Sequence, residues 1–64
     1  MWIINETGYA INTDYVVKFY QDDFDVIATV VGQPLPTTEI AVGETTIDAI
    51  ISNIISGTPV MEVR

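Results

Sequence analysis

The chain lacks most of the side chains that carry catalysis. Its 64 residues include no cysteine and no histidine, and only two Lys or Arg stand against nine Asp or Glu. The usual nucleophile, the proton shuttle for neutral pH and the ligands of structural zinc are therefore missing. The net charge of −7 also opposes binding to nucleic-acid phosphates, because Lys and Arg supply that affinity by displacing counterions. We predict a non-enzymatic protein without cofactor or metal and without direct contact to nucleic acid.

Long apolar runs are also absent. The longest run spans a few residues, far short of the roughly 20 that a membrane-spanning helix needs. Residues 1–6 carry neither the basic region nor the apolar run of a signal peptide. The lack of cysteine fits a reducing compartment. We therefore expect a cytoplasmic protein that does not enter a membrane.

Apolar residues are nonetheless abundant. They make up 48% of the chain, and the mean hydropathy is +0.36. A single domain spanning residues 1–64 is near the lower size limit for independent folding and cannot hide every large apolar side chain. The composition therefore predicts a homo-oligomer or a partner that covers an apolar face. A compact monomer with some exposed apolar residues remains the alternative.

Turn signals divide the first two thirds of the chain into short β-candidates. Asn5-Glu6-Thr7-Gly8 predicts a tight turn in which Gly8 takes a positive φ. A polar turn at residues 21–23 and a connection containing Pro34 and Pro36 separate later segments. The strand candidates are residues 2–4 with 9–11 returning beside them, 15–20, 24–31 and 37–42.

Residues 45–56 follow a helical period instead. Five isoleucines at positions 47, 50, 51, 54 and 55 share one side, Thr45 can cap the start, and Gly57 suits the residue after the end. Isoleucine is a mediocre helix former, so a strand remains the alternative here. Residues 60–64 predict either a last edge strand or a tail that adds to the sheet of a neighbouring subunit.

Together these segments predict an α+β fold. We expect a four-stranded antiparallel β-meander with one C-terminal amphipathic helix packed on a face and an extended tail. The alternation of apolar residues predicts a core of Trp2, Ile4, Ile11, Val17, Phe19, Val26, Ala28, Val30, Ile40, Val42, Ile47, Ile51, Ile54 and Ile55.

The densest acidic cluster is formed by Asp22, Asp23 and Asp25. A calcium loop of the EF-hand kind spreads its ligands over about 12 residues and needs a glycine at the sixth, where Ile27 stands when counted from Asp22. A solvated hairpin turn, in which aspartate is favoured, explains the cluster without a ligand. An acidic patch that imitates phosphates is the functional alternative.

Tyr20 lies beside this turn on the same predicted strand face as Lys18. Exposed aromatic residues are enriched in binding hot spots, and an acidic surface steers a protein toward a basic partner. We predict that Lys18, Tyr20, Asp22, Asp23 and Asp25 contact a partner protein. The alternative for the dispersed carboxylates is solubility alone.

Two other functions stay open. An oligomer could sequester a nucleotide signal through Lys18, Arg64 and the amides of Thr45 and Thr46. A structural protein could assemble through an apolar sheet edge.

The opening Met1-Trp2-Ile3-Ile4-Asn5, with the turn at Gly8 and the Ile11-Asn12 step, resembles a pattern in very short proteins of Gram-positive bacteria and their phages. Those proteins also resemble this chain in having a small sheet followed by one helix, often introduced by a step such as Gly43-Glu44. This chain departs from them in residues 34–36 and in its isoleucine-rich helix. The resemblance implies a phage or mobile-element protein, and small acidic phage proteins are often inhibitors of host defence. It therefore predicts an anti-defence inhibitor that covers a functional surface of a host protein in the host cytoplasm.

Overall fold

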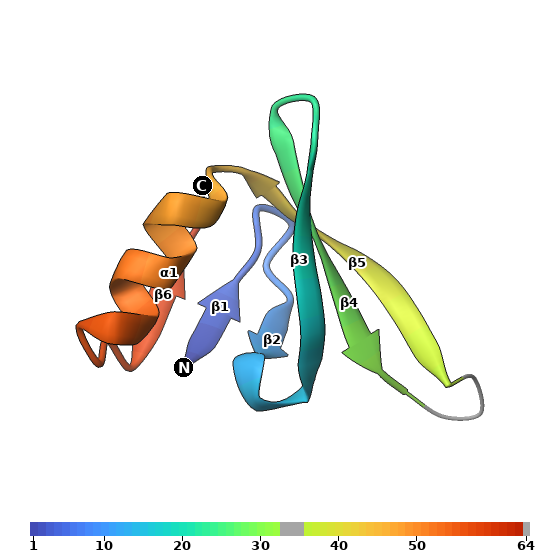
Figure 1. Ribbon diagram of the computed structural model, residues 1–64, viewed down its shortest axis with the longest axis horizontal. Helices are drawn as coiled ribbons and strands as arrows, with labels where there is room; N and C mark the ends of the chain where they lie inside the picture. Colours follow the sequence, from blue (N-terminus) through green and yellow to red (C-terminus); the bar gives the residue numbers. More distant parts are fainter. Residues whose placement is uncertain (33–35, 64) are drawn as a thin grey trace.

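A computed structural model describes residues 1–32 and 36–63. Within these residues the fold is α+β, with six strands in two three-stranded sheets and one α-helix (Figure 1). The predicted class is confirmed, whereas the connection at Pro34 lies outside the described residues. In chain order the elements are β1 (Trp2–Ile4), β2 (Ala10–Asn12), the 3-10 turn η1 (Thr13–Tyr15), β3 (Val16–Asp22), β4 (Asp25–Val31), β5 (Thr37–Glu44), α1 (Ile47–Ile55) and β6 (Val60–Glu62).

The strand topology corrects the predicted four-stranded meander. Strands β3, β4 and β5 form a three-stranded antiparallel meander, while the β1–β2 hairpin belongs to a second sheet. The turn η1 separates the two sheets, and its cap is the Asn12 side chain, which accepts a hydrogen bond from the Asp14 amide at 3.0 Å. The C-terminal tail is not free, because β6 pairs in parallel with β1 of the same chain.

The helix prediction is confirmed over the strand alternative. Thr46, rather than Thr45, is the N-cap, and its hydroxyl accepts a hydrogen bond from the Ala49 amide at 3.1 Å. Gly57 follows the helix with a φ of 73°, a left-handed conformation that costs glycine little. Ile50 is fully buried in a core shared by both sheets and the helix. The buried apolar residues are Ile3, Ile11, Val26, Ala28, Val42, Ile50 and Val63.

Several predicted core residues are exposed instead. In β1 the register sets Ile3 against Ile11 and Met61 on the buried side, so Trp2 faces away and is 47% exposed. In β3 the pairing shifts between Val16 and Lys18, and this bulge turns Val17 outward to 61% exposure.

The helix is also rotated relative to the prediction. Ile50 is its innermost residue, whereas Ile51 and Ile54 are each 45% exposed and Ile55 is 80% exposed. A bulge, or a rotation of the helix about its own axis, changes which residues face the core without changing the apolar pattern itself.

The turn after β1 joins the two sheets. Asn5 is 4% exposed, and its Nδ2 donates a hydrogen bond to the carbonyl oxygen of Ala41 in β5 at 3.0 Å. The Glu6 amide donates to the Val42 carbonyl at 3.3 Å. Gly43 has a φ of 124°, and a Cβ placed there would lie 3.0 Å from Oε2 of Glu6. Glycine is therefore needed at this point, where β5 bulges against the turn.

Candidate partner-binding face

The candidate site is the outer face of the β3-β4-β5 sheet. Its inner face packs on the core through residues such as Phe19, Ala28 and Ile40, so the alternate positions face solvent. The register places these outer residues in three rows across the strands. We call this surface the acidic face; its rows are Lys18–Thr29–Glu39, Tyr20–Ile27–Ala41 and Asp22–Asp25–Glu44.

Tyr20 is the fixed aromatic ring of the acidic face. Its hydroxyl donates a hydrogen bond to the carboxylate of Glu39, which reaches across β4 from the far edge of the sheet. The Lys18 Nζ lies 5.6 Å from the centroid of the Tyr20 ring, within the range of a cation–π interaction. The hydrogen bond to Glu39 raises the pKa of Tyr20, with smaller contributions from desolvation and from the negative charges of Glu39 and Asp22. The ring is therefore held in place from two sides.

Thr29 is a buried residue of the acidic face. Thr29 stands in the row between Lys18 and Glu39, yet it is only 8% exposed. Within residues 1–32 and 36–63 its hydroxyl has no hydrogen-bond partner. A buried hydroxyl without a partner is a destabilising feature.

The third row brings three carboxylates side by side. Asp22 pairs with Asp25 in the β3–β4 register, and Asp25 pairs with Glu44 in the β4–β5 register. Like charges directly opposite one another on adjacent strands destabilise a sheet. Among the described residues none of these three side chains is in an ion pair, and Lys18 stands over the Tyr20 ring instead. The negative charge of this row, which crosses the three strands at one end of the sheet, is therefore not offset by a cation.

An exposed aromatic residue stands beside this row. Phe24 is 79% exposed at the tip of the β3–β4 hairpin, and Asp23 next to it has a φ of 52°. The Gln21 amide holds the turn, since its Nε2 donates to the backbone oxygens of Asp23 at 3.0 Å and Asp25 at 2.9 Å.

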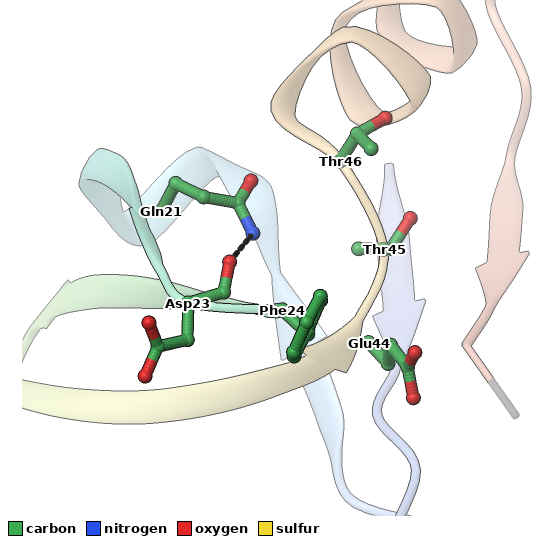
Figure 2. A pocket seen from close by; sticks show the side chains of 6 residues that line it. All are labelled: Gln21, Asp23, Phe24, Glu44, Thr45 and Thr46. Carbon is green, nitrogen blue, oxygen red and sulfur yellow. Dashed lines mark hydrogen bonds between the residues drawn. The ribbon is translucent and has the colours of Figure 1, made fainter.

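An open hollow of about 370 Å³ lies at this tip. Figure 2 shows the six residues around it: Gln21, Asp23, Phe24, Glu44, Thr45 and Thr46. Figure 2 shows the carboxylates of Asp23 and Glu44 pointing outward on opposite sides of the hollow, where their charges, together with the aromatic Phe24, favour a cationic side chain.

The structure places four of the five predicted site residues on one face of the sheet and the fifth beside it. Lys18, Tyr20, Asp22 and Asp25 lie on the acidic face, and Asp23 lines the adjacent hollow. The bend at residues 22–25 is a hairpin turn in the described structure. Within the described ranges no group of three Asp or Glu could hold a metal ion.

Sequence reasoning missed three residues of the site. Phe24 was predicted to be the first residue of the strand at 24–31, but the strand begins at Asp25 and leaves Phe24 exposed in the turn. A two-residue loop between paired aspartates is the local signal that could have indicated this. Glu39 and Glu44 reach the site through the pairing of β5 with β4, for which the sequence around them carries no local signal.

No match was found when the chain was compared with models of protein families, with curated proteins and with solved structures. In the part of the chain that the structure describes, no helix is long and apolar enough to cross a membrane.

Proposed function

We propose that this protein is a non-enzymatic binding module that covers a functional surface of a partner protein with its acidic face. The observation that carries the proposal is the row of Asp22, Asp25 and Glu44 beside the exposed Phe24. These like charges repel one another in the free protein. Positive charges on a partner surface would attract these carboxylates and offset their mutual repulsion, so the arrangement favours a cationic partner. Nucleic acid is not the expected partner, because its phosphates would face the same carboxylates.

The acidic face has the anatomy of a protein interface. Apolar and aromatic groups occupy its middle row, with Tyr20, Ile27 and Ala41 in register, and carboxylates lie on both sides of that row. Interfaces commonly combine such a centre with a polar rim, and aromatic residues often carry most of the affinity. Phe24 would insert next to one Lys or Arg side chain of the partner, with that cation seated in the hollow between Asp23 and Glu44.

The resemblance to short phage and mobile-element proteins guides the choice of partner. Host defence proteins with a basic functional surface are the first to test, and inhibition would follow from steric cover of that surface. The protein would act in the host cytoplasm, as the resemblance implies. No step of this proposal needs a cofactor or a reacting side chain.

The test compares variants of the binding face with a matched control. Phe24→Ala changes the hairpin tip beside the acidic face, and Asp25→Asn changes the face itself. Asp14→Asn makes the same charge change as Asp25→Asn in the exposed turn η1. Purified host defence proteins are screened for binding at about 150 mM salt, and the dissociation constant of each complex is measured for all four proteins. We expect Phe24→Ala to weaken binding about 30-fold, the effect of a hot-spot residue worth 2 kcal/mol.

Asp25→Asn should weaken binding and reduce its salt dependence, while Asp14→Asn should bind like the wild type. Binding that is indifferent to both Phe24→Ala and Asp25→Asn would overturn the assignment of the face. If no basic host protein binds at this salt concentration, the proposed function itself is overturned.

The two alternative functions have less support. A nucleotide held at the start of α1 would enter the hollow at Thr45 and Thr46, where Asp23 and Glu44 repel its phosphates. Lys18 is engaged with Tyr20, and Arg64 lies outside the described residues. Thermal unfolding with a panel of nucleotides should therefore show no stabilisation. A structural assembly protein predicts particles that grow with concentration, which light scattering detects.

A further inference from the structure

The outer side of α1 is an apolar stripe with nothing packed on it in the described chain. It consists of Ile51, Ile54 and Ile55, which are 45%, 45% and 80% exposed. Their spacing of three and four residues places them together on one helix face. Ile50 alone among the helix residues is fully buried, so the helix exposes more isoleucine than it buries. We call these three residues the isoleucine stripe.

The charge distribution indicates what covers the stripe. Residues 49–61 contain no charged residue, although the chain has nine Asp or Glu and a net charge of −7. The one acidic residue of the helix, Asp48, lies in its first turn. Within residues 47–61 a basic partner would find only the carboxylate of Asp48, which lies at one end of the stripe. Two copies of this acidic chain would repel at most surfaces, but they can approach here without placing like charges in contact.

We propose that a second copy of this chain docks on the isoleucine stripe, forming a two-fold symmetric dimer with antiparallel α1 helices. Such an interface is self-complementary, because each stripe contacts the same stripe of the other copy. Isoleucine ridges at this spacing interdigitate between helices.

The position of Asp48 selects the antiparallel orientation. With the two-fold axis near Asn53, five residues away, each Asp48 lies about 7.5 Å beyond the axis along the helix. The two carboxylates are then about 15 Å apart along the helix axis, beyond the Debye length of about 8 Å in physiological salt. Parallel helices would set them side by side.

The dimer leaves the acidic face free. Figure 1 shows α1 on one side of the molecule and the start of β5 on the other, whereas the end of β5, at Glu44, leads into the start of α1. The dimer would therefore present two acidic faces to partners. This inference does not depend on the proposed function, since it concerns a different surface with a different chemistry.

Solution mass as a function of concentration tests the dimer. Sedimentation equilibrium is measured from about 5 to 500 µM protein, at about 50 and 500 mM NaCl. We expect a reversible monomer–dimer equilibrium that tightens at higher salt, because salt screens the repulsion between two copies of charge −7. Binding of a basic partner to the acidic face should weaken with salt, so the two proposals give opposite trends.

A matched pair of variants locates the interface. Ile55→Lys and Tyr9→Lys each replace an exposed apolar residue, at 80% and 71% exposure, with the same cation. Ile55→Lys should weaken dimerisation at least tenfold, since it would place an ammonium group in each half of an apolar contact. Tyr9→Lys should leave the affinity of the dimer unchanged or slightly higher, because the added positive charge lowers the repulsion between copies. A lysine at the end of α1 suits the helix dipole, so Ile55→Lys should stay folded, as circular dichroism will verify.

A thiol placed in the stripe gives an independent measurement. Because the chain has no cysteine, Ile54→Cys carries the sole thiol and should oxidise readily to a covalent dimer, whereas Tyr9→Cys should not. A wild-type monomer at every concentration overturns the proposal and leaves the stripe to a different protein. Equal dimerisation of Ile55→Lys and Tyr9→Lys, or equal cross-linking of the two cysteine variants, also overturns it.

Discussion

Replacing Asn5 with alanine tests the joint between the two sheets. Asn5 Oδ1 accepts hydrogen bonds from the Tyr9 amide at 2.8 Å, from the Thr7 hydroxyl at 3.0 Å and from the Thr7 amide at 3.2 Å. Its Nδ2 donates the fourth bond, to Ala41 of the other sheet. At a net value of about 1 kcal/mol per bond, the four bonds contribute about 4 kcal/mol. The Thr7 groups lie on an exposed turn and can bind water in the variant, so we expect a loss of about 2–3 kcal/mol.

That loss is large for a domain of this size. A chain of 64 residues has a free energy of unfolding of roughly 3–10 kcal/mol, and the midpoint of thermal unfolding should fall by about 10–20 °C. Urea unfolding, followed by circular dichroism and by the fluorescence of Trp2, measures the change. Asn12→Ala is the control, because that side chain makes one hydrogen bond, to the Asp14 amide, and should cost about 0.5–1 kcal/mol. Equal costs for the two variants would refute the assignment of Asn5 as the joint.

Three further changes should have distinct effects. Asp25→Asn removes a charge from the acidic row and should raise the free energy of unfolding by about 0.2–1 kcal/mol in urea titrations, most strongly at low salt. Ile50→Ala should lower it by about 2–5 kcal/mol because the side chain is fully buried, whereas Ile55→Ala, measured at low protein concentration, should change it by less than about 0.5 kcal/mol. Glu39→Gln should lower the raised pKa of Tyr20 toward the ordinary 10.0, measured as the phenolate absorbance that Tyr20→Phe removes. Since the folded pKa lies above the unfolded one, the stability that the Tyr20–Glu39 bond adds is fully present below about pH 10 and is lost as the pH rises through the folded pKa.

Local sequence patterns predicted the helix, strands and turns better than they predicted which strands pair with each other. The helix needed only its own period and the terminating Gly57, and the first turn needed only Gly8, whose φ is 93°. The inner face of β1 was not predictable, because Trp2, Ile3 and Ile4 are all apolar and show no alternation. The pairing of β6 with β1 joins opposite ends of the chain, and three-residue strands carry no signal for such a contact.

For the candidate site, too, the sequence predicted the local part and not the part that depends on strand pairing. The opposition of Asp22 and Asp25 follows from a two-residue turn, which is a local feature. Glu44 joins their row only because β5 bulges between the residues opposite Val26 and Ile27. A shift of register by one position would have sent its carboxylate to the other face.

The arrangement of these carboxylates argues against solubility as their sole purpose. Charges that serve solubility act equally well when far apart, and most acidic residues of this chain are dispersed. The Asp22–Asp25–Glu44 row instead concentrates like charge where it opposes strand pairing, next to a turn that also exposes Phe24 and holds Asp23 at a positive φ. The like charges lower the stability of the hairpin tip in the free protein, and a cationic partner would relieve their repulsion on binding. The amides of this tip should therefore exchange with solvent faster than those of the sheet centre in the free protein, and should slow most when a basic partner binds.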